Sequence, residues 1–72
     1  MSEGMTIAVQ VNGAPREVPA ELTVRDLVRM LGFEQELVAV EVNQELVPRA
    51  EHAVRSVRSG DRIEIVEFVG GG

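Results

Sequence analysis

The sequence predicts an α+β fold in which one main helix packs on a mixed sheet of about five strands. Residues 23–31 are the one segment with apolar residues at helical spacing, and the segments around it alternate as strands do. The first and last of these strands, residues 7–11 and 62–69, are the most apolar. A chain of 72 residues has room for one domain with one small core.

The first two strands are predicted to form a hairpin. Residues 7–11 alternate apolar with small or polar residues, which is typical of a half-buried strand. Asn12-Gly13 follows, and this dipeptide favours a two-residue type I′ turn. The returning strand, residues 16–18, has a proline on each side, so it is expected to be short and to lie at an edge.

The helix is predicted over residues 23–31. Thr23 is a good N-cap, and Asp26 three residues later completes a pair that resembles a capping box. Gly32 suits the left-handed position that ends helices. One face of the helix is apolar and is expected to pack on the sheet, through Val24, Leu27, Val28 and Leu31.

The second half of the chain supplies the remaining strands. Residues 38–42 alternate as a strand, Asn43-Gln44 is a turn, and a short strand at 45–47 stops before Pro48. Residues 49–58 are mostly polar and predict an irregular crossing with about one helical turn. A turn at 59–61 then leads into the last strand.

The last strand breaks strict alternation. Ile63 and Ile65 fall on one face, whereas Val66 and Phe68 fall on the other. Either both faces of the strand are covered, or a bulge shifts its phase, or Val66 and Phe68 are exposed. The sequence leaves burial and exposure of these two residues equally open.

This order of elements is that of the β-grasp, or ubiquitin-like, architecture. The first and last strands are expected to be parallel neighbours in the middle of the sheet, because ordinary right-handed crossovers can then connect them. The first hairpin lies on one side of this pair, and the third and fourth strands lie on the other.

Three glycines, Gly70 to Gly72, follow the last strand. Glycine contributes nothing to a core and is costly to order, so residues 70–72 are expected to be a flexible tail, thin enough for a narrow cleft. A frayed terminus or a linker remnant is the alternative interpretation. The predicted domain covers residues 5–69, after a flexible leader at 1–4.

The composition favours a protein partner over nucleic acid. Twelve acidic residues against seven arginines give a net charge of −5, which repels phosphate backbones and favours a basic protein surface. There is no lysine, so no side-chain amine is available for isopeptide attachment. With two Phe and no Trp or Tyr, the aromatic platforms that bind single strands are also missing.

Other classes of site are disfavoured as well. The chain has no cysteine, which excludes disulfides and thiolate catalysis and fits a cytoplasmic location. No apolar segment is long enough to predict a membrane span. His52 is the only histidine and is expected at the surface. The acidic pairs Glu34/Glu36 and Glu64/Glu67 are interpreted as solvated faces, so neither a metal site nor a catalytic residue is predicted.

Two stretches resemble the small ubiquitin-like sulfur carriers, and among them the ThiS family of thiamine biosynthesis. One is residues 38–49, with Asn43 ahead of Val47-Pro48-Arg49; the other is residues 59–72, from Ser-Gly-Asp to the glycines. The resemblance covers about residues 5–72. Relatives such as the small subunit of molybdopterin synthase tend to carry a proline before the glycines, where this chain has Glu67-Phe68-Val69.

The resemblance implies a sulfur carrier that is a protein co-substrate rather than an enzyme. In that family an E1-like, ThiF-like enzyme uses ATP to adenylate the C-terminal glycine carboxylate, which then becomes a thiocarboxylate. Sulfur comes from a donor such as a cysteine desulfurase and passes to thiazole synthase (ThiG-like). The positions carried over are Gly71 and Gly72, with Gly72 bearing the sulfur. A carrier for another pathway, or an interaction module that forms no conjugates, is the alternative.

We also expect a docking surface beside the tail. The sheet surface that leads into the tail is predicted to bind the activating enzyme through an apolar centre. This centre includes Phe68 and Val66 if they are exposed, and Glu64 and Glu67 form an acidic rim that suits a basic partner.

Overall fold

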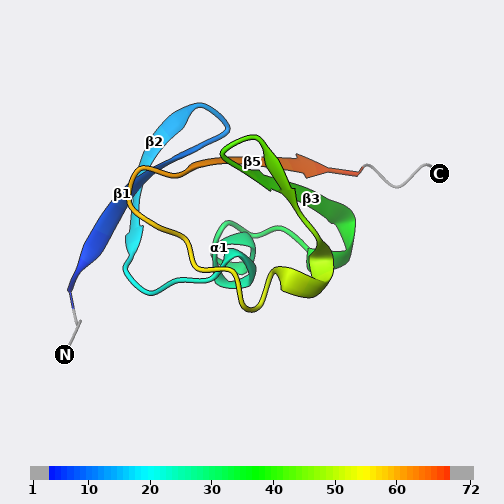
Figure 1. Cartoon of the computed structure of the whole chain (residues 1–72), viewed down its shortest axis with the longest axis horizontal. Helices are drawn as coiled ribbons and strands as arrows, with labels where there is room; N and C mark the ends of the chain where they lie inside the picture. Colours follow the sequence, from blue (N-terminus) through cyan, green and yellow to red (C-terminus); the bar gives the residue numbers. More distant parts are fainter. Residues whose placement is uncertain (1–3, 69–72) are drawn as a thin grey trace.

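The computed structural model describes residues 4–68 and shows one five-stranded sheet with a helix packed on one face (Figure 1). The strand order is β2-β1-β5-β3-β4, and β1 and β5 are parallel neighbours at the centre. The predicted β-grasp arrangement is therefore confirmed. The elements are β1 (Thr6–Val11), β2 (Ala14–Pro19), α1 (Val24–Met30), β3 (Val38–Val42), β4 (Glu45–Val47) and β5 (Arg62–Glu67), with short 3₁₀ helices η1 (Gln35–Leu37) and η2 (Arg49–Glu51).

Strand β2 lies at the edge as predicted, but it is longer than expected and includes both prolines. The two-residue turn pairs Val11 with Ala14, and the ladder continues to Thr6 opposite Pro19. Hydrogen-bonded and non-bonded pairs alternate in an antiparallel ladder, so Pro15 and Pro19 fall where the main chain faces solvent. An edge strand therefore accepts both prolines without losing a ladder bond.

Both hairpins turn through the left-handed region. Asn12 and Gly13 have φ angles of 51° and 83°, as the type I′ prediction requires. Asn43 and Gln44 have φ angles of 53° and 70° and join β3 to β4 in the same way. These two turns set the registers of β1 against β2 and of β3 against β4.

Helix α1 begins and ends close to the predicted positions. The Thr23 hydroxyl accepts a hydrogen bond from the Asp26 N–H at 3.1 Å, and the Asp26 carboxylate accepts one from the Thr23 N–H at 3.2 Å. This is the predicted capping box. Gly32 follows with a φ of 87°, the left-handed conformation predicted to end the helix.

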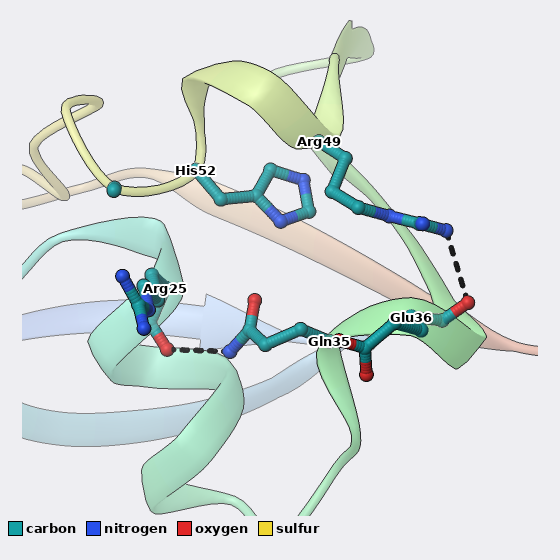
Figure 2. A pocket seen from close by; sticks show the side chains of 6 residues that line it. Arg25, Gln35, Glu36, Arg49 and His52 are labelled. Atoms are coloured by element: carbon teal, nitrogen blue, oxygen red, sulfur yellow. Dashed lines mark hydrogen bonds between the residues drawn. The ribbon is translucent and has the colours of Figure 1, made fainter.

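The prediction that His52 lies at the surface is wrong. Its side chain is 3% exposed, and its Nε2 lies 3.0 Å from the Val47 carbonyl oxygen (Figure 2). The turn of η2 brings the ring under β4, and the His52 carbonyl accepts a hydrogen bond from the Arg25 N–H at 2.9 Å. A histidine can be buried when a main-chain carbonyl accepts a hydrogen bond from its ring N–H, and the sequence contained no sign of this partner.

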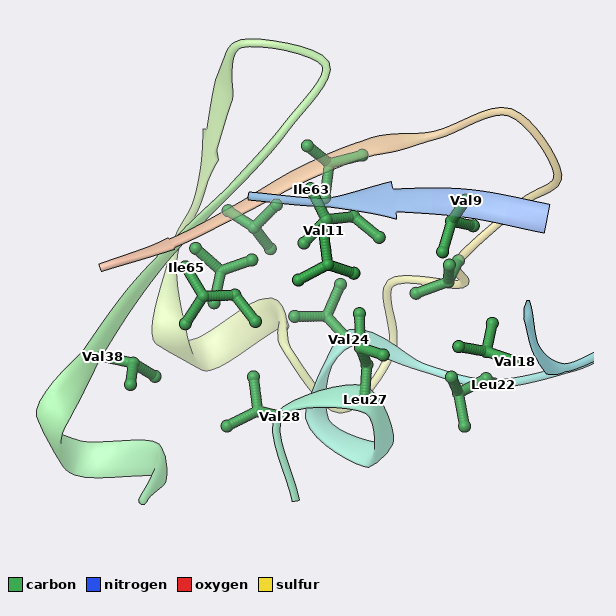
Figure 3. Packing of buried hydrophobic residues seen from close by; sticks show 14 residues of the cluster. Val9, Val11, Val18, Leu22, Val24, Leu27, Val28, Val38, Ile63 and Ile65 are labelled. Atoms are coloured by element: carbon green, nitrogen blue, oxygen red, sulfur yellow. The ribbon is translucent and has the colours of Figure 1, made fainter. Parts of the chain in front are cut away.

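The core lies between α1 and the inner face of the sheet (Figure 3). Valine dominates it, and the central strand contributes Ile63 and Ile65 at 1% and 5% exposure. Val57 anchors the crossing after η2 to the same cluster, whereas Val54 in that crossing is exposed. The buried cluster consists of Val9, Val11, Val18, Leu22, Val24, Leu27, Val28, Val38, Val40, Val42, Val47, Val57, Ile63 and Ile65.

Replacing Thr23 by alanine is expected to lower the free energy of unfolding by about 1 kcal/mol, because α1 loses its N-cap. Urea unfolding at neutral pH measures this. Ser59→Ala is the control, since that exposed hydroxyl makes no hydrogen bond within residues 4–68. Equal stability of Thr23→Ala and the control would contradict the role of the cap.

The capping box also makes stability depend on pH. Hydrogen bonds from the Thr23 main chain and side chain lower the pKa of Asp26. A lowered pKa adds stability above the unfolded pKa, and this contribution is lost as the pH falls through the folded value. Asp26→Asn should therefore flatten the acid limb of the pH–stability curve, measured by urea unfolding. An unchanged acid limb would argue against this contribution.

Candidate functional site

The candidate site is the outer face of the sheet beside the end of β5, where the chain leads toward the glycines. The alternation of β5 continues without a bulge, with Val42 opposite Ile63 and Val38 opposite Glu67. The inner side chains meet the helix, so the outer ones face solvent. Val66 is 56% exposed and Phe68 is 53% exposed, which decides the question that the sequence left open in favour of exposure.

Neighbouring strands extend this apolar surface. Ala39 of β3 pairs with Val66, and Leu46 of β4, which is 64% exposed, pairs with Glu41. Strand alternation places Phe68 on the same side as Val66. We call the four residues Ala39, Leu46, Val66 and Phe68 the outer apolar patch.

Two acidic residues border the outer apolar patch. Glu64 lies opposite Glu41 in the β3–β5 ladder, and both side chains are exposed on the outer face. Glu67 lies opposite Val38, whose side chain is buried on the helix side. Alternation therefore directs Glu67 to the other face, so the structure brings Glu64 and not Glu67 to the rim predicted with Val66 and Phe68.

Two asparagine side chains hold β5 at its edges. Asn12 follows the end of β1, and its Oδ1 accepts a hydrogen bond from the Ile65 N–H at 2.8 Å while its Nδ2 donates to the Ile65 carbonyl at 3.3 Å. Asn43 Oδ1 accepts from the Arg62 N–H at 3.0 Å, and its Nδ2 donates to Asp61 Oδ1 at 3.0 Å. Turn residues of the two hairpins thus hold β5 at its start, Arg62, and in its middle, Ile65.

The hydrogen bonding between β5 and the chain segment of β3 continues one residue past the end of β5. The Phe68 N–H donates a hydrogen bond to the Leu37 carbonyl at 2.6 Å. This bond continues the ladder pattern between β3 and β5 as far as Phe68. The predicted sulfur-bearing residues Gly71 and Gly72 lie outside the described residues, as do residues 1–3 and 69–70.

Residues 4–68 offer no acidic or histidine cluster suited to a metal ion. The acidic pairs Glu34/Glu36 and Glu64/Glu67 are exposed, in agreement with their interpretation as solvated faces. No helix among the described residues is long and apolar enough to cross a membrane.

Sequence reasoning missed Ala39, Leu46 and Glu41 as parts of this face. The Asn43-Gln44 turn contained the signal, because a two-residue turn sets the β3–β4 register and places Leu46 opposite Glu41. Together with the predicted position of β3 beside the last strand, this register would have placed Ala39, Glu41 and Leu46 on the outer face of the sheet.

Comparison with known proteins matches residues 9–72 to the ThiS family. A crystal structure of the thiamine biosynthesis protein ThiS from Geobacter metallireducens is similar to this chain, with a TM-score of 0.78 and 36% identity. The match covers 92% of this chain and 100% of that chain. The sulfur carrier protein ThiS of Escherichia coli (strain K12) is 33% identical over 61 residues, which are 85% of this chain and 92% of that protein.

Longer relatives carry a different name. A thiazole synthase of Paramagnetospirillum magneticum is 45% identical over 62 residues, which are 86% of this chain but only 19% of that protein. A thiazole synthase of Magnetococcus marinus gives a similar result, with 20% of its length covered. The chain therefore spans about a fifth of the length of these two relatives.

Phe68→Ala is expected to change the free energy of unfolding by less than about 0.5 kcal/mol, because the ring is exposed. Ile65→Ala, on the inner face of the same strand, should cost about 2–5 kcal/mol through loss of burial and a cavity. Urea unfolding of both variants tests the assignment of the two faces. A Phe68→Ala protein as unstable as Ile65→Ala would place Phe68 in the core.

Proposed function

The chain belongs to the ThiS family, and we propose that it is a sulfur carrier of thiamine biosynthesis whose reactive group is the Gly72 carboxylate. Family membership over residues 9–72 is the observation that carries this proposal. The fold supports it, since β5 ends beside an exposed apolar patch and leads directly into the glycine segment.

The chemistry of a carboxylate explains why partner enzymes are needed. An α-carboxyl group is ionised at neutral pH and is a poor electrophile. In the proposed cycle an E1-like, ThiF-like enzyme transfers AMP from ATP to the Gly72 carboxylate and releases pyrophosphate. A sulfur nucleophile derived from a cysteine desulfurase then attacks the carbonyl carbon and displaces AMP.

Thiazole synthase is the proposed acceptor of the sulfur. The two long relatives named thiazole synthase contain a region similar to this chain, which supports a close association between carrier and synthase. We place the carrier in the cytoplasm with these enzymes. It acts as their co-substrate, and the catalytic groups belong to them.

The outer apolar patch is the proposed docking surface for the adenylating enzyme. It lies on the strand that leads to Gly72, so docking there also aligns the tail with the active site. Glu64 and Glu41 border the patch, and the net charge of −5 suits a partner with a basic surface.

The carrier function is tested by the intact mass after co-expression with a bacterial thiamine operon. Exchange of one C-terminal oxygen for sulfur is the expected result. A chain from which Gly72 is deleted, or to which a residue is added after it, should stay unmodified, whereas Gly70→Ala should still be modified. Sulfur incorporation into the extended chain would contradict the assignment of Gly72.

A separate experiment tests whether the active-site cleft of the E1-like enzyme accepts a side chain at position 71. Gly71→Val is expected to impair adenylation because a branched Cβ widens the tail next to the reactive carboxylate. Pyrophosphate release by the cognate E1-like enzyme measures it, with Gly70→Ala as the control. Equal rates for the two variants would mean that the cleft accepts a side chain beside Gly72.

Docking is tested with two neighbouring charge reversals. Glu64→Arg should slow association with the E1-like enzyme and reduce its salt dependence, while Glu67→Arg, on the opposite face, should have the smaller effect. Phe68→Ala should raise the dissociation rate. Surface plasmon resonance at several salt concentrations measures all three, and a larger effect of Glu67→Arg than of Glu64→Arg would move the docking surface to the helix side.

A further inference from the structure

The half of β5 that leads toward the glycines has a strand neighbour on one edge only. Strand β1 pairs with β5 at Arg62 and Ile63 and then ends, whereas the pairing with β3 continues as far as Glu67. Figure 1 shows β5 running past the tip of the β1–β2 hairpin toward the C-terminus. Residues 64–67 therefore have an edge that no strand in the described part of the chain covers.

A single side chain, that of Asn12, serves this open edge. Successive residues of a strand direct their main-chain N–H and C=O groups to alternate edges. The Ile63 carbonyl accepts a hydrogen bond from the Asn12 N–H at 2.8 Å, so Ile63 and Ile65 both face the β1 side. There Asn12 Oδ1 accepts from the Ile65 N–H at 2.8 Å, and Asn12 Nδ2 donates to the Ile65 carbonyl at 3.3 Å. The carboxamide thus takes the place of one strand residue.

The turn alone does not account for asparagine at position 12. Asn12 has a φ of 51°, and Asn, Asp and Gly all suit the first central position of a type I′ turn. Of these three residue types, only asparagine carries both a donor and an acceptor in its side chain. Both are used on Ile65, which is 53 residues away in the sequence. Asn12 therefore has a second role, which is to fix β5.

The other hairpin provides a direct comparison. Asn43 occupies the same turn position, with a φ of 53°, and its carboxamide also reaches β5. It accepts a hydrogen bond from the Arg62 N–H at 3.0 Å, at the start of the strand, and donates one to Asp61. The two asparagines therefore differ in which half of β5 they hold, and only Asn12 holds the half that continues toward Gly72.

We propose that Asn12 is a positioning residue for the reaction at Gly72, because its carboxamide fixes the direction in which β5 leaves the domain. This inference rests on the proposed carrier function. Gly72 is four residues past Phe68, and an extended chain of that length spans ~13 Å. A change of about 10° in the direction of β5 would move the carboxylate of an extended tail by ~2 Å. A displacement of ~1 Å can slow a reaction about 100-fold.

Docking and positioning depend on different contacts of β5. Val66 pairs with Ala39 of β3, and the Phe68 N–H donates to the Leu37 carbonyl, so neither contact involves Asn12. The outer apolar patch should therefore persist without the Asn12 carboxamide. Its loss is expected to slow the reaction of a docked tail and to leave docking itself nearly unchanged.

Asn12→Gly tests the proposal, and Asn43→Gly is the matched control. Glycine adopts the left-handed turn conformation readily, so each variant keeps its hairpin and loses only a carboxamide. Pyrophosphate release by the cognate E1-like enzyme gives kcat and KM for both variants and for the parent chain. Asn12→Gly should lower kcat about tenfold, the effect of about one net hydrogen bond, with KM within about twofold of the parent. Asn43→Gly should change neither constant by more than about twofold.

Amide hydrogen exchange gives a readout that does not depend on the enzyme. In the free chain, labelled with ¹⁵N, the amides of Val66 and Phe68 should exchange faster in Asn12→Gly than in Asn43→Gly, because the second half of β5 is then held at one edge only. Urea unfolding of both variants corrects for differences in global stability. Equal exchange in the two variants after this correction would overturn the proposal.

The kinetic outcomes separate this inference from the function on which it rests. A parent chain that the E1-like enzyme does not adenylate would contradict the carrier function, and the positioning role with it. An active parent with equal kcat for Asn12→Gly and Asn43→Gly would overturn the positioning role alone, and so would a rise in KM without a fall in kcat. If Asn12→Gly does not fold, Asn12→Asp replaces it, because aspartate suits the turn and accepts from the Ile65 N–H but cannot donate.

Discussion

Strand β5 must satisfy two conditions at once: it is the centre of the sheet, and it also carries the chain out to the glycines. As the central strand it needs hydrogen-bond partners on both edges. Strand β1 supplies them only as far as Ile63, after which the Asn12 side chain serves the main chain of Ile65. A side chain thus replaces a strand residue, and β5 can extend beyond the hairpin.

The two faces of β5 have different roles: the inner face contributes to stability, and the outer face is available for binding. Ile63 and Ile65 pack on the helix with the valines of β1 and β3, which is where a small domain obtains its stability. Val66 and Phe68 add almost nothing to that core because they face solvent. Changes in the outer apolar patch can therefore alter partner binding without unfolding the protein.

The topology, the helix with its capping box, both hairpin turns and the turn before β5 could be predicted from local patterns. The exposure of Val66 and Phe68 could not, because alternation gives the phase of a strand but not what covers each face. His52 was misjudged since its partner is a main-chain carbonyl of β4, which composition does not reveal. The place of Glu67 on the opposite face from Glu64 could have been predicted, because residues three apart in one strand point to opposite faces, and the β3–β5 register agrees with this.

The charge distribution also separates the two faces. The outer face of the sheet carries Glu41 and Glu64 beside the patch and, by alternation along β5, Arg62, whereas five of the seven arginines belong to α1 and residues 48–61. A helix with its side chains is ~10 Å across, and charges are screened over about 8 Å at physiological salt. The fields on the two sides therefore act nearly independently. A basic enzyme surface can therefore approach Glu41 and Glu64 while most of the arginines lie on the other side of the sheet.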